Sequence, residues 1–284
     1  MKNRVICFIA ASLMLCGCGG SDDSSKPLTS AATTTVGISF ADAESKADAP
    51  SEPEQSSTDD SYTKIPAKRN IKLMTFGDSI THGYWMLGGY RKYLCDKLEE
   101  NGYSENVDFV GSRQGGDCYD PDHEGYSGYM INGGPEPSIG EFMPDRLKTY
   151  KPDVLTIMIG TNDILGAYEI EKAPDRLEAM LDEAFPLMPE DGMIFISPIP
   201  PVDVVAAGGS EQLAATYDAY INEYNARVRE LVKKKQSEGR RIELVEAGTA
   251  LEKSDMIDGI HPNADGYKKL ADVWYNVIVS YITK

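Results

Sequence analysis

The chain of 284 residues has only three histidines and five cysteines, few basic residues and no long apolar run. Its 28 Lys and Arg stand against 45 Asp and Glu, which gives a formal net charge of -17. Contact with nucleic-acid phosphates needs clustered cations, so this balance excludes nucleic acid as the expected partner. No stretch reaches the ~20 apolar residues of a transmembrane helix, so no permanent membrane span is expected. The 41% of hydrophobic residues still suffices for a folded core.

The first 18 residues have the pattern of an export signal. Lys2 and Arg4 precede a short apolar stretch, residues 5–15, which is typical of a secretory signal peptide. Residues 15–18 (LCGC) resemble the end of a bacterial lipoprotein signal, which predicts that Cys18 becomes the first mature residue and carries lipid. Acyl chains on Cys18 would hold the protein at the membrane of the bacterial cell surface. Cleavage without lipid, followed by secretion, is the alternative.

Residues 19–68 are predicted to form a disordered tether. Of the 48 residues from Gly19 to Pro66, 38 are Ser, Thr, Ala, Pro, Asp, Glu or Gly. Such a segment buries too little apolar surface to offset the entropy lost on ordering. Residues 69–284 are then expected to form one folded domain, and we expect a monomer.

Two cysteines, Cys95 and Cys118, lie in this predicted domain, and the other three belong to the export signal. An exported protein can oxidise its thiols, so a bridge between the two is one interpretation. Two cysteines do not make a disulfide framework, however. Cys95 lies on the apolar side of the helix-like stretch 90–101, where we expect a buried free thiol rather than a bridge.

Short apolar runs alternate with longer amphipathic stretches from residue 69 onward. We expect strands at 71–76, 107–110, 154–159, 193–196 and 242–245, and helices at 90–101, 139–150, 175–185, 211–236 and 262–281. The run 154–159 (VLTIMI) is apolar on both faces except for one Thr, as in a central parallel strand. The alternation predicts an α/β domain with a parallel sheet of about five strands, covered on both faces. Ligands bind at the carboxyl ends of such strands.

A serine and a histidine–aspartate pair lie where such a site is expected. Ser79 follows the first predicted strand, in the segment 77–81 (GDSIT). A serine hydroxyl is a poor nucleophile until a base takes its proton, and the base needs an orienting acceptor. Near the C-terminus, the segment 258–262 (DGIHP) puts Asp258 three residues before His261. We therefore predict that Ser79 is a nucleophile, His261 its general base and then acid, and Asp258 the acceptor that orients His261.

A third segment follows the third predicted strand and reads GTND, residues 160–163. Ester cleavage by a serine produces an oxyanion, which preorganised donors stabilise. The amide of Asn162 is suited to this role, and Asp163 beside it is expected to hold the surrounding loops. The chain lacks the G-x-S-x-G elbow at Ser79, so the standard α/β-hydrolase pattern is absent.

The segments GDSIT, GTND and DGIHP resemble the consensus blocks of the SGNH (GDSL-type) hydrolases, a family of esterases and lipases. The remaining block of that family provides a glycine N–H to the oxyanion hole. The match favours Gly128 here, with Gly125 as the alternative. The resemblance implies an oxyanion hole made by the backbone N–H groups of Ser79 and Gly128 and the side-chain amide of Asn162, and it implies no metal and no organic cofactor.

Further segments (GGYR, VDFVGS and DPDHEGYSGYMI) are similar to the acetylxylan esterases of carbohydrate esterase family three. The resemblance covers nearly all of residues 69–284. It implies a three-layer α/β/α flavodoxin-like sandwich and an enzyme that removes O-acetyl groups from acetylated xylan or its oligosaccharides through an acetyl-serine. Two alternatives remain: a lipase, lysophospholipase or thioesterase for longer acyl chains, and a glycan-binding surface lipoprotein without catalysis. Residues 131–143 (INGGPEPSIGEFM) depart from the family pattern because they lengthen the path to Asn162.

Several further residues are candidates for the rim of the substrate site: Asp78, His82, Tyr84, Trp85, Tyr129 and Asp163. The aromatic side chains among them would suit stacking on sugar rings. Ser127 is a rival nucleophile in name only, because no strand-to-loop turn is expected before it. Four acidic residues could ligate Ca²⁺, but their spacing does not match an EF-hand loop, so no metal site is predicted: Asp117, Asp120, Asp122 and Glu124.

Overall fold

The computed structural model describes residues 65–284. The predicted signal peptide with Cys18, and the predicted tether up to residue 64, lie outside the described residues. Residues 65–68 were expected to belong to the tether, but they contact the domain. The hydroxyl of Tyr103 donates to the carbonyl of Ile65 at 2.8 Å, and the N–H of Lys68 donates to the carbonyl of Ile282 at 2.8 Å. The first described residues therefore pack beside the last turn of the C-terminal helix.

A central sheet of seven strands runs through the described part of the chain, in the order β3-β4-β1-β5-β6-β7 with β2 also beside β1. The strands are β1 (Ile71–Gly77), β2 (Val107–Phe109), β3 (Arg113–Gln114), β4 (Asp122–Gly125), β5 (Val154–Met158), β6 (Met193–Ser197) and β7 (Ile242–Leu244). The pairs β2–β1, β1–β5, β5–β6 and β6–β7 are all parallel. These five strands are the ones that the sequence predicts.

The short pair β3 and β4 was not predicted, because DHEG has no apolar alternation. β2 pairs with the start of β1, and β4 pairs with the end of β1 at Phe76 and Gly77, so both lie on the same edge of that strand. The chain leaves this edge after Val110, runs through residues 111–121, and returns as β4. This return brings the segment after Gly125 to the carboxyl end of β1.

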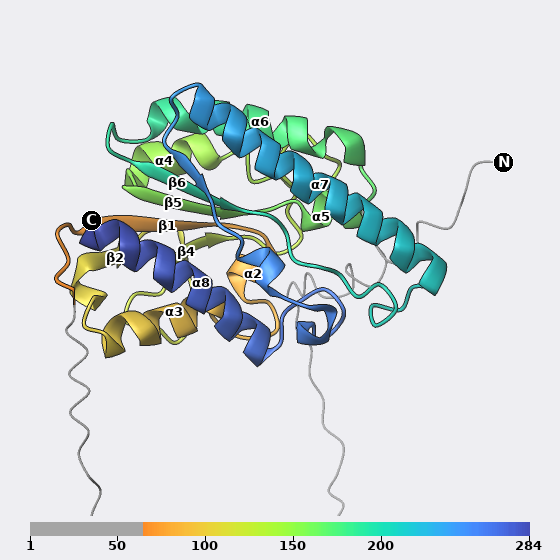
Figure 1. The fold of residues 1–284 in the computed structure, drawn as a ribbon, viewed down its shortest axis with the longest axis horizontal. Helices are drawn as coiled ribbons and strands as arrows, with labels where there is room; N and C mark the ends of the chain where they lie inside the picture. Colours follow the sequence, from red (N-terminus) through yellow and green to blue (C-terminus); the bar gives the residue numbers. More distant parts are fainter. Residues whose placement is uncertain (1–64) are drawn as a thin grey trace, which may run out of the picture. The chain divides into compact units, whose positions relative to one another are not determined.

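Helices cover both faces of the sheet, which makes three layers (Figure 1). The α-helices are α2 (Ser79–His82), α3 (Gly89–Glu100), α4 (Met143–Tyr150), α5 (Thr161–Leu165), α6 (Ala173–Ala184), α7 (Glu211–Ser237) and α8 (Ala264–Thr283). Short 3₁₀ helices span Ser104–Asn106, Ile170–Lys172, Phe185–Leu187, Gly248–Ala250 and Lys253–Asp255. α3 and α8 pack on one face, and α4, α5, α6 and α7 pack on the other. The predicted α/β/α sandwich is confirmed.

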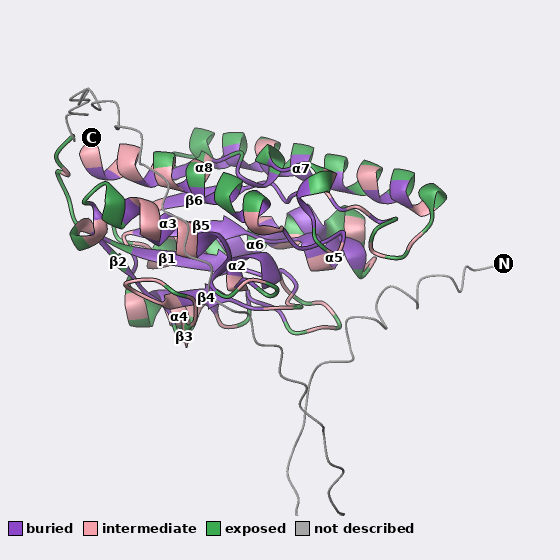
Figure 2. Cartoon of the chain, turned by 90° about the horizontal axis from the view of Figure 1, so that it is seen from below, coloured by how far each residue is buried: buried purple, intermediate pink, exposed green. Residues whose placement is uncertain are grey.

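Two apolar cores lie between these layers, one on each face of the sheet. All five residues of β5 are buried, and Figure 2 shows the central strands as the buried interior of the domain. Leu155 and Ile157 belong to the core under α4–α7, whereas Val154 and Met158 belong to the core under α3 and α8. This is the two-sided burial that the run VLTIMI predicts. The helix expected over 139–150 begins only at Met143, with Pro144 in its first turn.

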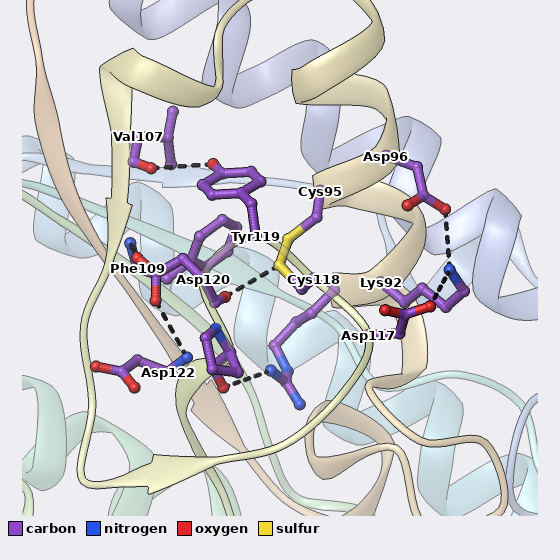
Figure 3. The surroundings of a disulfide bond; sticks show 12 residues. Lys92, Cys95, Asp96, Val107, Phe109, Asp117, Cys118, Tyr119, Asp120 and Asp122 are labelled. Carbon is purple, nitrogen blue, oxygen red and sulfur yellow. Dashed lines mark hydrogen bonds and ion pairs between the residues drawn. A yellow bond between two sulfur atoms is a disulfide. The ribbon is translucent and has the colours of Figure 1, made fainter.

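Cys95 of α3 and Cys118 form a disulfide, with their Cα atoms 5.6 Å apart (Figure 3). The expectation of a free thiol at Cys95 is therefore wrong. Its partner lies in the excursion 111–121, which other bonds also fix. The hydroxyl of Tyr119 donates to the carbonyl of Val107 at 2.9 Å, and Asp120 accepts the N–H of Phe109 at 2.8 Å. Residues 111–121 are thus attached to both α3 and β2.

None of the helices between residues 65 and 284 combines the length and the hydropathy needed to cross a bilayer.

Candidate active site

Ser79 follows a tight turn at the carboxyl end of β1, at the point where α2 begins. A Cβ atom on Gly77 would lie 2.5 Å from both the carbonyl oxygen of Met158 and the hydroxyl of Thr81, so only glycine fits there. Asp78 caps α2, because its carboxylate accepts the N–H of Ile80 at 3.0 Å. Ser79 is the first residue of α2, so its backbone N–H has no acceptor within the helix.

The structure brings His261 and Asp258 to Ser79. Nε2 of His261 is 2.8 Å from Oγ of Ser79, and Nδ1 is 2.7 Å from Oδ2 of Asp258. The other carboxylate oxygen accepts the backbone N–H groups of Ile260 and His261, at 2.9 Å and 2.7 Å. Partial burial raises the pKa of Asp258, but the hydrogen bonds from His261 and Ile260 outweigh it and hold the pKa well below its usual range. Asp258 is therefore an anion that fixes the orientation of the imidazole.

Two exposed aromatic residues follow α2 and cover this histidine–aspartate pair. Nε1 of Trp85 donates to Oδ2 of Asp258 at 2.5 Å, which is the oxygen that also contacts His261. The ring of Tyr84 lies 5.1 Å from the ring of His261 and 5.4 Å from that of Trp85. The side chains of Tyr84 and Trp85 are exposed, so both lie at the rim of the site.

Two of the donors expected for the oxyanion come from α5 and from the loop after β4. Asn162 is in α5, at the carboxyl end of β5, and its amide donates to the carbonyl of Tyr129 at 2.8 Å, which leaves its second N–H. That bond attaches Asn162 to the loop that carries Gly128, which has a φ of 82° and is exposed. Gly125, the alternative, is buried in β4 and its N–H already donates to Nδ1 of His123 at 3.0 Å. The geometry therefore favours Gly128 over Gly125.

Asp78 and Asp163 are almost completely buried and do not face the rim, where we expected them. Burial raises the pKa of Asp78 from its usual 3.8 to about 6. Asp163 accepts the N–H of Ile131 at 3.0 Å and a guanidinium N–H of Arg176 at 2.8 Å. Burial raises the pKa of Asp163 as well, against the lowering effect of Arg176. Asp163 thus ties α5 and α6 to the loop that follows Gly128, which agrees with its expected supporting role.

His82 does not face Ser79 but contacts Ser127 instead. Nδ1 of His82 is 2.7 Å from Oγ of Ser127, and its ring stacks on that of His123. Ser127 does follow a strand, β4, contrary to the expectation. Burial together with Arg113 and Arg91 lowers the pKa of His82, and burial lowers the pKa of His123 to about 2. Among the contacts of residues 65–284, no carboxylate hydrogen bonds to His82, so this pair lacks the orienting acid that His261 has.

Arg91 is a supporting residue that the sequence analysis missed. Its side chain is 1% exposed and donates to the carbonyls of Thr81 and His82 in α2 and to those of Gly115 and Pro121 in the excursion, at 3.1–3.4 Å. Burial lowers the pKa of Arg91 to about 10. The sequence does contain a sign of this role, since the charged Arg91 interrupts the apolar side of the predicted helix 90–101.

The four acidic residues weighed as calcium ligands have other partners. Asp117 is 3.6 Å from the ammonium of Lys92, and Asp120 accepts the N–H of Phe109. Asp122 accepts from Gln114, and Glu124 accepts from Ser112 and Tyr126. Over residues 65–284 no group of three or more acidic, histidine or cysteine side chains is arranged to hold a metal ion.

Residues 75–269 match the family model described as the GDSL-like Lipase/Acylhydrolase family. The chain belongs to this family and is by class a carboxylic ester hydrolase. It is similar to a multidomain esterase of Ruminococcus flavefaciens, with 34% identity over 238 aligned residues and 76% of this chain covered. The match spans only 29% of that larger protein.

Two solved structures are also similar to this chain. The family 3 carbohydrate esterase of Clostridium thermocellum is 30% identical with a TM-score of 0.60, covering 76% of this chain and 100% of that one. A carbohydrate esterase family 3 structure from Talaromyces cellulolyticus is 23% identical with a TM-score of 0.59, covering 75% and 98%. The second likeness supports the fold alone. The resemblance seen in the sequence is confirmed.

Proposed function

We propose that this protein is a serine esterase that removes O-acetyl groups from a polysaccharide, acetylated xylan or its oligosaccharides. The observation that carries the proposal is the hydrogen-bonded series Ser79–His261–Asp258 at the carboxyl edge of the sheet, with distances of 2.8 Å and 2.7 Å. The similarity to the family 3 carbohydrate esterase of Clostridium thermocellum, at 30% identity, supports a carbohydrate substrate.

In the first half of the reaction, Nε2 of His261 takes the hydroxyl proton of Ser79 while Oγ bonds to the acetyl carbonyl carbon. The carbonyl oxygen becomes an oxyanion, which accepts hydrogen bonds from the N–H groups of Ser79 and Gly128 and from the free amide N–H of Asn162. The intermediate then collapses. The bond from the acetyl carbon to the sugar oxygen breaks, and His261 returns its proton to that oxygen. Acetyl-Ser79 remains.

Water completes the cycle. It gives a proton to Nε2 of His261 as it attacks acetyl-Ser79, and the same donors hold the second oxyanion. Collapse breaks the bond between the acetyl carbon and Oγ, releases acetate and returns the proton to Ser79. Throughout, Asp258 keeps Nδ1 of His261 protonated, so that Nε2 is free to act as base.

Acetate release from acetylated xylan tests the proposal, with the full chain and its Ser79→Ala variant measured side by side. Release by the parent and none by the variant would support both the esterase and its substrate. If neither releases acetate, the polysaccharide assignment is wrong, and the assay moves to p-nitrophenyl esters of increasing acyl length.

Longer acyl chains are the second candidate, because two exposed apolar side chains lie on the active-site turn and on a loop bonded to it. Ile257 and Val205 are both exposed, and the loop of Val205 is bonded to the active-site turn through the N–H of Asp203 and the carbonyl of Gly259 at 2.7 Å. A kcat/KM that rises from acetyl to octanoyl esters would favour this candidate over the acetylesterase.

For the location, we propose export and anchoring through lipid on Cys18. The support is the sequence of residues 1–18. In a bacterial host, the parent should partition into a detergent phase and carry labelled fatty acid. The Cys18→Ser variant should do neither. If the parent protein were found only in the culture medium, the proposal of an anchored protein would be wrong and the protein would be a secreted one.

A further inference from the structure

Oδ2 of Asp258 accepts two hydrogen bonds at once, from Nδ1 of His261 at 2.7 Å and from Nε1 of Trp85 at 2.5 Å. With the two backbone N–H groups on Oδ1, the carboxylate has four donors. The indole N–H is the one donor of these four that comes from outside the turn 258–261. It therefore joins this carboxylate to the loop after α2, in addition to the contacts that the turn makes through His261 with Ser79 and through Gly259 with Asp203.

The loop that carries Trp85 begins at the nucleophile itself. The N–H groups of Gly83 and Tyr84 both donate to the carbonyl of Ser79, at 2.9 Å and 3.1 Å. The end of the loop is closed by a bond from the N–H of Gly89 to the carbonyl of Met86 at 2.7 Å. Trp85 thus connects the backbone of the serine to the carboxylate at the other end of the Ser–His–Asp series.

The loop that carries Trp85 also packs against residues 111–121. A Cβ atom on Gly88 would lie 2.9 Å from the Cα atom of Gly116, so the two backbones are in direct contact. Gly116 is two residues from Cys118, which the disulfide attaches to α3. The loop that carries Trp85 therefore packs against a segment that is itself held by the disulfide. This packing preorganises the position of Trp85.

We propose that Trp85 is a positioning residue for the esterase reaction, acting through its N–H on Asp258. This inference rests on the proposed function. The indole holds Oδ2 in line with Nδ1 of His261 and withdraws charge from the carboxylate. Without that bond the carboxylate is more basic and stabilises the protonated imidazole more strongly. The base is then lost at higher pH, and the less well aligned imidazole takes the proton of Ser79, and of water in the second half of the reaction, more slowly.

A sugar-stacking role is the competing explanation, because the side chain of Trp85 is 57% exposed. Two substitutions separate the roles. Trp85→Phe keeps an aromatic face and removes the N–H, whereas Trp85→Ala removes both. p-Nitrophenyl acetate is the substrate of choice, since it carries no sugar and its hydrolysis still needs Ser79, His261 and Asp258.

For Trp85→Phe we expect kcat/KM for p-nitrophenyl acetate to fall roughly tenfold, which is the size expected for a hydrogen bond to a charged group. The fall should be in kcat, with KM within twofold, and the acid limb of the pH–rate profile should move to higher pH. Leu87→Ala, at an exposed position of the same loop, should leave that limb in place. Unchanged kcat and pH profile in Trp85→Phe would overturn the proposal, as would a defect limited to KM.

A measurement without turnover keeps this test independent of the proposed function. The chain has two tryptophans, so its ¹⁵N–¹H spectrum should show two indole signals. Within the described residues Nε1 of Trp274 is buried without a hydrogen-bond partner, which makes it an internal reference for folding. In Asp258→Asn the Trp85 signal should move upfield while that of Trp274 stays. If the chemical shift of the Trp85 indole were the same in Asp258→Asn as in the parent, the bond between Trp85 and Asp258 would be disproved. This outcome does not depend on whether the parent cleaves an ester.

Discussion

Oγ of Ser79 lies 2.8 Å from Nε2 of His261, although 182 residues separate the two in the chain. One comes from the turn after β1 and the other from the turn before α8. Because the carboxyl end of β1 and the start of α8 meet at one edge of the sheet, the fold alone brings them together. The alignment is what makes a serine at this position usable as a nucleophile.

Alanine substitutions of Ser79 and Ser127 show which of the two serines is the nucleophile. Ser79→Ala should lower kcat for p-nitrophenyl acetate by at least roughly a thousandfold, because within residues 65–284 no other nucleophile has a histidine oriented by a carboxylate. Ser127→Ala is the matched control, since Ser127 also contacts a histidine, at 2.7 Å. It should stay within about threefold of the parent. A collapse of activity in the Ser127 variant instead would move the nucleophile to that residue.

Asp78→Asn should change how stability depends on pH. The pKa of Asp78 is raised from 3.8 to about 6 in the folded protein. The native state therefore binds this proton more tightly than the unfolded chain, and the parent loses stability as the pH rises from about 4 to about 6. Asparagine still caps α2 but has no charge to bury.

Urea unfolding of both proteins between pH 4 and pH 7 measures this effect. Relative to the parent, the free energy of unfolding of the variant should increase by about 3 kcal/mol between the lower and the upper end of that pH window. A difference that stays constant with pH would contradict the raised pKa of Asp78.

Opening the disulfide should destabilise the domain. It closes a loop of 23 residues between Cys95 and Cys118, so its loss should cost about 3 kcal/mol and lower Tm by roughly 10 °C. Thermal unfolding with and without a reducing agent measures this directly. In Cys118→Ala the reducing agent should cause no further drop. An equal Tm for the oxidised and reduced parent would show that the bond contributes nothing.

Arg91→Lys should test the buried guanidinium under α2. A lysine keeps the charge but cannot serve four carbonyls at fixed angles, so we expect a loss of about 3 kcal/mol in the free energy of unfolding. Lower kcat should accompany it, because α2 carries Ser79. Arg229→Lys is the control, since its pair with Glu246 at 2.7 Å lies at the surface and should cost under about 1 kcal/mol. Equal losses in both variants would contradict a special role for Arg91.

The sequence was most informative where local pattern and tertiary structure agree. The five parallel strands follow from apolar runs, and the run VLTIMI indicated a strand buried on both sides. β4 is not predictable from its residues, because Asp122–Gly125 pairs with β1 through backbone hydrogen bonds. Such pairing does not require an apolar pattern in the sequence. The predicted start of this helix, residue 139, is too early because Ile139 and Phe142 extend the apolar pattern, although residues 139–142 are not helical.

Contacts between distant loops were beyond local reasoning. Cys118 meets Cys95 only because the chain between β3 and β4 folds back against α3. Asp78 and Asp163 were expected at the rim, since polar residues after strands usually face solvent, but a helix cap and an arginine hold them inside. Trp85 was expected at the rim, where it lies, yet its bond to Asp258 depends on how two loops approach each other.

The bond between Lys68 and Ile282 has a consequence for protein engineering. The first described residues and the last turn of α8 lie side by side, with the N–H of Lys68 2.8 Å from the carbonyl of Ile282 and its ammonium 3.1 Å from the carbonyl of Lys284. A short linker can therefore join them without crossing the sheet. A circular permutant opened at an exposed turn such as Glu238–Arg240 would keep every strand in its place. It would also reverse the order in which the serine and histidine segments are synthesised.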